Sequence, residues 1–294
     1  MRAGCKINLW LHVGERLPSG HHALESLLLP LEEPHDTLDI RVLSGSSEGL
    51  AQTSFVTAAE GRPIFGIDPK DNTLTRAAAW HAGQTGFRPS LDIRVRKGIP
   101  HGAGLGGGSS DAAALLLWLR EQAALAGIDL PPFSHFLESA AAIGADVPFF
   151  LLRKPAQAEG IGEKLRPVAN PYAGYFLLLV CPADISISTA WAFAALDRER
   201  NEKTPPGSLT SQESRAKSTL AHDGNDFESL VFAAYPELGR LFERLMHSGA
   251  ESARMSGTGS SLFGLYREEK IAREAAKTLA RDGLSVYIQY LPEG

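Results

Sequence analysis

The chain has 294 residues, of which 44% are hydrophobic and 21% are charged. This composition is typical of a globular protein with a substantial core, and the length predicts two domains. The formal net charge is −5, and the sequence has no long basic run. Both features argue against nucleic acid as the main partner, because phosphate contacts need clustered lysines and arginines.

Alternation of apolar and polar residues predicts strands in the first half of the chain, at residues 5–13, 37–43 and 91–95. Residues 72–82 have helical spacing, and Asn72 is the expected N-cap. Residues 44–68 are rich in Gly and Ser, and they predict loops and short strands. After a glycine-rich segment, two apolar helices are predicted at residues 112–126 and 133–143.

Pro and Gly residues interrupt the pattern around residues 158–171. We place the domain boundary there, which gives domains at residues 1–163 and 164–294. The polar segment 198–224 contains almost no large apolar residues and predicts a surface insertion. The other elements predicted in this half are strands at residues 175–180, 262–266 and 285–290 and helices at residues 188–196, 236–247 and 268–281.

Strands and helices are mixed along the whole chain, and most strands alternate in polarity. Alternation favours antiparallel or mixed sheets with one solvated face. The predicted fold class is therefore α+β, with two layers in each domain.

No segment reaches the ~18 consecutive apolar residues that a membrane span needs. The first residues also lack the basic and then apolar pattern of a signal peptide. We therefore expect a cytoplasmic protein without a membrane partner.

Cys5 and Cys181 lie far apart and match no metal-ligand spacing, so they are interpreted as reduced, buried thiols.

The segment from Pro100 to Asp111, PHGAGLGGGSSD, places five glycines between a predicted strand and a predicted helix. Glycine lets the backbone approach a ligand closely and adopt positive φ. The N–H groups at the helix start and the helix dipole favour an anion, and a polyphosphate fits best. Ser109 and Ser110 can cap the helix or offer hydroxyl groups to a phosphate or to Mg²⁺. Asp111 is interpreted as a carboxylate that stabilises the first helical turn.

Two other phosphate-binding motifs also contain a glycine-rich segment and are considered as alternatives. A Walker A loop ends in Gly-Lys-Ser/Thr, and the absence of a lysine here excludes it. Gly102, Gly104 and Gly107 match the Gly-x-Gly-x-x-Gly pattern of a dinucleotide-binding fold, and Asp129 follows about twenty residues on. That motif needs a buried parallel strand before it, whereas residues 91–96 carry charges at alternate positions. We therefore disfavour it.

The glycine-rich segment resembles the phosphate loop of the GHMP kinase superfamily. Four other segments resemble motifs of the same superfamily and occur in the same order along the chain: KINL at 6–9, GHHAL at 20–24, IGADVPFF at 143–150 and MSGTGSS at 255–261. The segment NDFE at 225–228 also fits the superfamily. The resemblance covers nearly the whole chain. It implies an N-terminal domain similar to ribosomal protein S5 domain 2, a ferredoxin-like C-terminal domain, and an ATP-dependent kinase acting on a small-molecule alcohol.

Within the superfamily, the segment is most similar to the branch that phosphorylates the 2-hydroxyl of a cytidine diphosphate-linked methyl-branched alcohol in non-mevalonate isoprenoid synthesis. The implied cofactors are ATP and Mg²⁺, and the implied partner is the small-molecule cytidine diphosphate substrate. We expect a monomer or weak homodimer. Two alternatives remain: another small-molecule kinase of the superfamily, such as homoserine or mevalonate kinase, and a non-catalytic nucleotide sensor on the same fold. The presence of both Lys6 and Asp146 disfavours the sensor.

The resemblance also implies roles for individual residues. Asp146 corresponds to the catalytic aspartate and Lys6 to the catalytic lysine, while Ser110 is the expected Mg²⁺ ligand. The substrate would contact Asn8, His21, His22, Thr189 and Phe193. The superfamily branch usually has tyrosine where this chain has His21, which weakens the expected stacking on cytosine. The residues expected to bind ATP are Pro100, Gly102, Ala103, Gly104, Leu105, Gly106, Gly107, Gly108, Ser109 and Ser110.

Overall fold

The computed structural model describes residues 1–43, 51–57, 61–62, 64, 67–203 and 224–292. The chain divides into two compact units. The first unit comprises residues 1–6, 15–101 and 106–169, and the second comprises residues 7–14, 102–105 and 170–294. The sequence predicted a single boundary after residue 163, and this division differs from it in two ways. Residues 164–167 form a strand of the first unit, and two short segments from the first half of the chain belong to the second unit.

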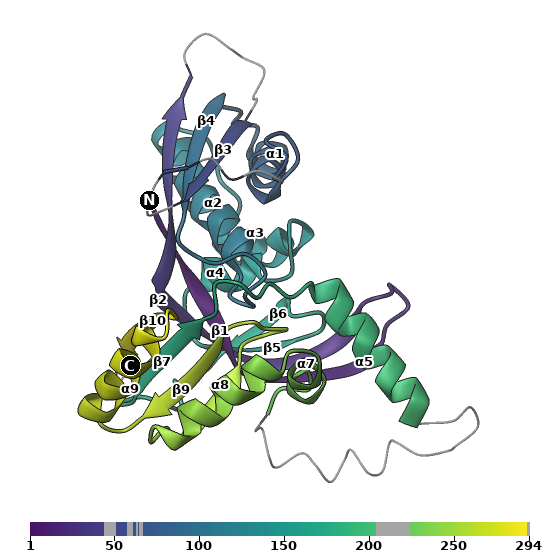
Figure 1. The fold of residues 1–294 in the computed structure, drawn as a ribbon. Helices are drawn as coiled ribbons and strands as arrows, with labels where there is room; N and C mark the ends of the chain where they lie inside the picture. Colours follow the sequence, from purple (N-terminus) through teal and green to yellow (C-terminus); the bar gives the residue numbers. More distant parts are fainter. Residues whose placement is uncertain (44–50, 58–60, 63, 65–66, 204–223, 293–294) are drawn as a thin grey trace. The chain divides into compact units, whose positions relative to one another are not determined.

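The described residues of the first unit contain a six-stranded sheet, although residues 7–14 of its strand β1 are assigned to the second unit (Figure 1). Its main path runs β3-β4-β2-β5-β6, and β1 pairs with β2. Along the main path the pairs are antiparallel except β3 with β4, which is parallel, so the sheet is mixed as predicted. The strand bounds are β1 Arg2–Arg16, β2 His22–Val42, β3 Ala51–Thr57, β4 Leu91–Lys97, β5 Ala156–Glu159 and β6 Lys164–Pro167.

Four α-helices and a short 3-10 helix lie among the described residues of this unit: α1 Thr73–Thr85, α2 Gly107–Leu125, α3 Phe133–Ser139, η1 Ala140–Ala142 and α4 Val147–Leu152. Asn72 caps α1 as predicted, because its side chain accepts hydrogen bonds from the N–H groups of Leu74 and Thr75. The apolar face of α2 packs with β4 residues such as Ile93 and Val95 in the main core. This packing holds the N-terminus of α2 close to the end of β4.

The second unit contains a four-stranded antiparallel sheet in its described residues, in the order β10-β7-β9-β8. The strands are β7 Phe176–Cys181, β8 Ser252–Met255, β9 Leu262–Tyr266 and β10 Ser285–Tyr290. The helices are α5 Thr189–Lys203, α7 Glu228–Ala234, α8 Pro236–His247 and α9 Glu269–Arg281. α8 and α9 pack on the sheet through buried leucines and alanines, and Pro236 occupies the first turn of α8 as predicted.

Several sequence predictions need correction. α2 begins at Gly107 rather than at residue 112, because its first turn has packing partners even though glycine has a low helix propensity. The sequence predicted a domain boundary around residues 158–171, but β5 and β6 form a hairpin that overlaps this region. The sequence pattern did not reveal the hairpin, because each of its strands has only four residues. Of the predicted insertion, residues 198–203 belong to α5, and residues 204–223 lie outside the described residues.

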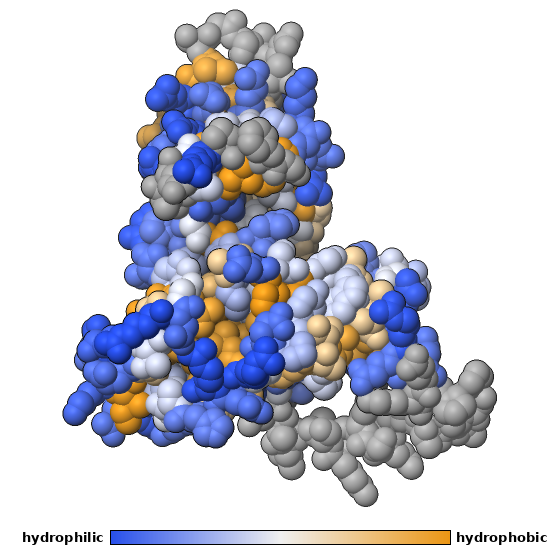
Figure 2. Space-filling model, viewed as in Figure 1, coloured by the Kyte–Doolittle hydropathy of each residue, from blue (hydrophilic) through white to orange (hydrophobic). Residues whose placement is uncertain are grey.

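The distribution of hydrophilic and apolar residues on the surface is that expected of a globular protein. The visible face is mostly hydrophilic, and apolar residues occupy limited areas of it (Figure 2). Cys5 and Cys181 are buried thiols, as predicted, and neither forms a disulfide bond. Within the described ranges, no helix is long and apolar enough to cross a membrane.

Candidate active site

Lys6 and Asp146 form an ion pair inside the first unit. The Nζ atom of Lys6 lies 3.9 Å from Oδ2 of Asp146, and the side chain of Lys6 is only 7% exposed while that of Asp146 is 34% exposed. Lys6 lies on β1, and Asp146 lies in the turn before α4. The structure therefore brings together a buried ammonium group and a solvent-accessible carboxylate that are distant in the sequence.

Asp146 occupies the N-cap position of α4, but its side chain makes no capping hydrogen bond. A capping aspartate would accept a hydrogen bond from an N–H group in the first helical turn. The carboxylate is therefore directed to the Lys6 side rather than to the helix. Because the side chain of Asp146 is 34% exposed, its carboxylate is accessible to a hydroxyl group of a bound molecule.

The N-terminus of α2 lies next to this pair. Gly106 is the N-cap with φ +73°, and it supplies no side-chain hydrogen bond to the first turn. A Cβ atom at Gly106 would lie 2.9 Å from the ring of Phe150 and 3.3 Å from Cγ of Lys6. Similarly, a Cβ atom at Gly144 would lie 3.6 Å from Oγ of Ser109. The helix start, Lys6 and the Asp146 turn are thus packed against one another.

This helix start fits an anion. The first N–H groups of a helix have no partner within it, and the helix dipole places partial positive charge there. Gly106 leaves these groups without a side-chain cap, and Gly108 is exposed. Contrary to the sequence prediction, neither Ser109 nor Ser110 caps the helix, because both lie inside it. Ser109 is half-buried beside the Asp146 turn, while Ser110 is buried.

The middle of the glycine-rich segment, residues 102–105, belongs to the second unit. The side chains of Ala103 and Leu105 are buried, so these residues can offer a ligand mainly their backbone. Oγ of Ser256 donates a hydrogen bond to the carbonyl of Gly104 at 3.0 Å and accepts one from the N–H of Asn8 at 3.2 Å. One buried serine therefore links the glycine-rich segment to the β1 residue predicted to bind substrate.

The buried residue Asn225 supports the loop of residues 255–261, which contains Ser256. Its side-chain amide donates hydrogen bonds to the carbonyls of Met255 and Gly257, at 2.8 and 2.7 Å. Its Oδ1 atom accepts a hydrogen bond from the N–H of Phe227 at 2.9 Å. The sequence analysis identified a family motif at residues 255–261, and the role of Asn225 in holding this loop emerges only from these contacts.

Replacing Gly104 with Ala is expected to destabilise the protein by steric conflict. A Cβ atom at Gly104 would lie 2.0 Å from the carbonyl oxygen of Ser256, and φ is +74°. Overpacking of this kind typically costs about 1–3 kcal/mol. Gly283→Ala is the matched control, because φ is +80° there and no atom lies within 4 Å of the added Cβ. Urea denaturation would measure the free energy of unfolding of each variant. An equal decrease in Gly104→Ala and Gly283→Ala would contradict the steric explanation.

Asp111 forms a buried ionic cluster rather than a cap for the first turn, and the sequence interpretation of it was wrong. It lies beyond the first turn of α2, and its Oδ2 atom accepts a hydrogen bond from Nζ of Lys97 at 2.8 Å. Nζ of Lys97 also contacts Oδ2 of Asp36. Burial raises the pKa of Asp111 to about 7, and the charge of Lys97 only partly offsets this effect. For Lys97, burial alone would lower the pKa, but the two carboxylates outweigh burial and raise it.

The residues predicted to bind substrate are divided between the units. In the first unit, His21 is exposed in the turn before β2, and His22 is buried as the first residue of β2. In the second unit, Thr189 is exposed at the start of α5, with Oγ1 3.4 Å from Oγ1 of Thr258. The half-buried ring of Phe193 packs edge-on against Phe227 at 5.0 Å, so at least one edge of it belongs to the core.

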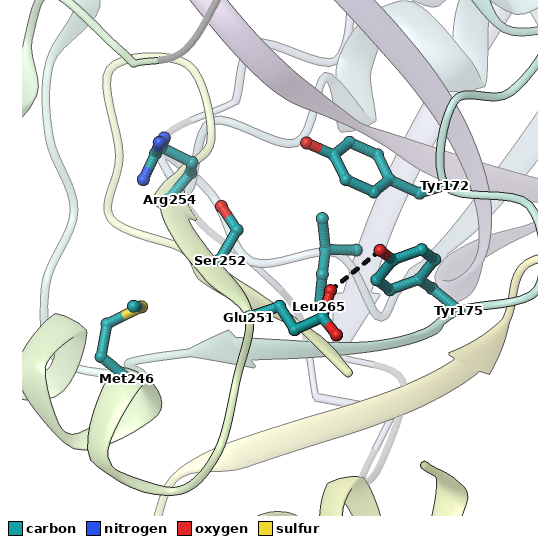
Figure 3. Close-up of a pocket in the computed structure, with 7 residues that line it drawn as sticks. All are labelled: Tyr172, Tyr175, Met246, Glu251, Ser252, Arg254 and Leu265. Carbon is teal, nitrogen blue, oxygen red and sulfur yellow. Dashed lines mark hydrogen bonds between the residues drawn. The ribbon is translucent and has the colours of Figure 1, made fainter. Parts of the chain in front are cut away.

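The second unit also contains a cavity of about 340 Å³. Its wall includes Tyr172, Tyr175 and Arg254, and Oη of Tyr175 donates a hydrogen bond to Glu251 at 2.9 Å (Figure 3). None of the residues predicted to bind ATP or substrate lines this cavity. Over the parts of the chain that are described, no three His, Cys, Asp or Glu side chains are grouped to hold a metal ion.

Comparison with known proteins defines the class. Residues 72–154 match the GHMP kinases N terminal domain, and residues 212–283 match the GHMP kinases C terminal domain. The chain therefore belongs to the GHMP kinase family, as the sequence motifs indicated, and it is a kinase that phosphorylates a small-molecule alcohol.

Several relatives of this chain have the same name. The chain is 45% identical to the 4-diphosphocytidyl-2-C-methyl-D-erythritol kinase of Nitratidesulfovibrio vulgaris, over 98% of this chain and 96% of the relative. It is 38% identical to the enzyme of the same name from Bacteroides fragilis, over 91% and 92%. A crystal structure of 4-(cytidine 5'-diphospho)-2C-methyl-D-erythritol kinase matches the whole of both chains, with 32% identity and a TM-score of 0.73. A homoserine kinase from Cytophaga hutchinsonii, with 14% identity and a TM-score of 0.61, shares the fold.

Proposed function

We propose that this chain transfers the γ-phosphoryl group of ATP to the 2-hydroxyl of 4-diphosphocytidyl-2-C-methyl-D-erythritol, a step of the non-mevalonate route to isoprenoid precursors. The observation that carries the chemistry is the buried Lys6 paired with Asp146 beside the uncapped N-terminus of α2. The substrate assignment rests on relatives of that name that match almost the whole chain. Its setting would be the cytoplasm.

Asp146 acts in this proposal as the group that orients the substrate hydroxyl and accepts its proton. Its carboxylate is 34% exposed and is not used for capping, so it can reach a bound molecule. Lys6 stabilises the negative charge that develops on the attacking oxygen, and its burial strengthens that interaction. Phosphoryl transfer depends mainly on such positioning and charge stabilisation.

The glycine-rich segment holds the nucleotide phosphates through backbone N–H groups at the start of α2. Gly106, Gly107 and Gly108 present that backbone without side chains, and Ser109 adds a hydroxyl beside the Asp146 turn. When bound, ATP supplies the phosphoryl group, and Mg²⁺ neutralises part of the phosphate charge. Ser110, which is buried, would contact Mg²⁺ in this proposal, and Oγ of Ser109 lies beside Gly144 in the turn before α4.

Incubation of the protein with ATP, Mg²⁺ and 4-diphosphocytidyl-2-C-methyl-D-erythritol tests the function directly. ADP release and a phosphorylated cytidine product are expected with this substrate, and the assay is repeated with homoserine and mevalonate. Faster turnover of either would favour another kinase of the family. Nucleotide binding without turnover of any alcohol would favour a nucleotide sensor.

Replacement of His21 tests recognition of the cytosine. Stacking of an aromatic ring on a base contributes about 1–3 kcal/mol, and imidazole has a smaller face than phenol. His21→Tyr is therefore expected to lower the KM for the cytidine substrate by a few-fold, and His21→Ala to raise it, with an unchanged KM for ATP. His135→Tyr, at an exposed histidine of α3, is the control. If both His21 variants match the wild type, His21 does not contact the substrate.

A further inference from the structure

A buried cluster of Asp36, Lys97 and Asp111 joins the two ends of the glycine-rich segment. Lys97 is the last residue of β4, from which the chain enters the segment, and Asp111 lies in α2, into which the chain leaves it. Nζ of Lys97 donates to Oδ2 of Asp111 at 2.8 Å and contacts Oδ2 of Asp36. All three residues belong to the first unit.

Asp36 extends the cluster to the backbone of the segment. Its Oδ1 atom accepts hydrogen bonds from the N–H groups of Gly98 and Ile99, at 2.7 and 2.9 Å. These are the two residues that follow β4. The same carboxylate thus holds the incoming chain with one oxygen atom and Lys97 with the other.

The first turn of α2 is packed tightly against this cluster. A Cβ atom at Gly107 would lie 3.1 Å from Cγ2 of Ile99 and 3.4 Å from Oδ2 of Asp36. The start of α2 is therefore close to Ile99 and Asp36, and a side chain at Gly107 would be crowded there.

A buried ionic cluster of this kind contributes little net stability to a fold. Asp36 is fully buried, and the side chains of Asp111 and Lys97 are only 3% and 15% exposed. Removing charges from water costs free energy that their mutual attraction often fails to recover, and apolar residues of similar volume would often stabilise a fold as well or better. A role in fixing geometry accounts for a buried cluster at this place.

We infer that Asp36, Lys97 and Asp111 are positioning residues that fix the start of α2 for the nucleotide phosphates. None of them touches the reacting atoms in this account. The inference rests on the proposed function for the identity of the ligand, and it assigns the cluster an effect on nucleotide affinity that a purely structural cluster would lack.

Two variants break the cluster in different ways. Lys97→Met keeps most of the side-chain volume and removes the ammonium group shared by the two carboxylates. Asp36→Asn keeps an oxygen that can accept the hydrogen bonds from Gly98 and Ile99 but weakens the link to Lys97. Arg96→Met is the matched control, because Arg96 is the preceding residue of β4, its side chain is 46% exposed, and it forms a surface ion pair with Asp39.

The dissociation constant of a non-hydrolysable ATP analogue with Mg²⁺ is measured at temperatures where circular dichroism shows each protein folded. We expect Lys97→Met to weaken binding at least tenfold and Asp36→Asn several-fold, with Arg96→Met unchanged. In turnover assays the KM for ATP should rise in the same order, while the KM for the alcohol substrate stays within twofold of wild type.

Analogue affinity within twofold of wild type in folded Lys97→Met and Asp36→Asn would overturn the inference. Failure of both variants to fold would also overturn it, because the cluster would then serve the stability of the unit as a whole. If the wild-type protein binds no ATP analogue, the proposed function fails instead. If it binds the analogue but does not phosphorylate the cytidine substrate, only the substrate assignment fails.

Discussion

Asp146→Asn is expected to lower kcat by about 10²–10⁴-fold while nucleotide binding persists, because an amide cannot accept the proton of the substrate hydroxyl. The substitution is isosteric and occurs at a side chain that makes no capping hydrogen bond, so α4 should remain intact. Single-turnover kinetics separates the chemical step from product release, and a fluorescent ATP analogue reports binding.

Asp129→Asn is the matched control for this variant. Asp129 is an exposed carboxylate in the loop after α2, and its neutralisation should leave kcat unchanged. If Asp146→Asn retains more than about a tenth of wild-type kcat when chemistry limits the rate, Asp146 is not the proton acceptor.

Lys6→Met is expected to lower kcat by about 10²–10³-fold, the usual cost of removing a preorganised group that stabilises charge in the transition state. The side chain is only 7% exposed, and methionine fills a similar volume, so the fold should survive. Because Asp146 is one-third exposed, its charge stays solvated without Lys6. Lys154→Met, at an exposed lysine near the end of α4, controls for the loss of one positive charge.

The double variant Lys6→Met with Asp146→Asn tests whether the pair acts as a unit. Residues that act together show strongly non-additive losses, so the double variant should have a kcat close to that of the slower single variant. Multiplied losses would show that the two residues act independently and would remove the coupling from the proposed mechanism.

The local elements of the fold could be predicted from the sequence because their signals are local. Asn72 starts a helix through hydrogen bonds to residues two and three positions away, and Pro236 starts another through its fixed φ. The glycine-rich segment between a strand and a helix indicated an anion site. Its match to a known family identified Lys6 and Asp146, which no spacing in this sequence would have joined.

The amino-acid sequence was therefore sufficient for the fold class and, through the family motifs, for the pair of Lys6 and Asp146, while anion binding at the glycine-rich segment stays a prediction. Which distant side chains meet depends on the three-dimensional fold. Asp36 and Lys97 are 61 residues apart, and no periodicity brings them together; the antiparallel pairing of β2 with β4 does. The fold also assigned Asp111 to an ion pair rather than a cap and packed Gly106 against Phe150. Such contacts depend on the register of strands and on packing in the core, which no local sequence pattern specifies.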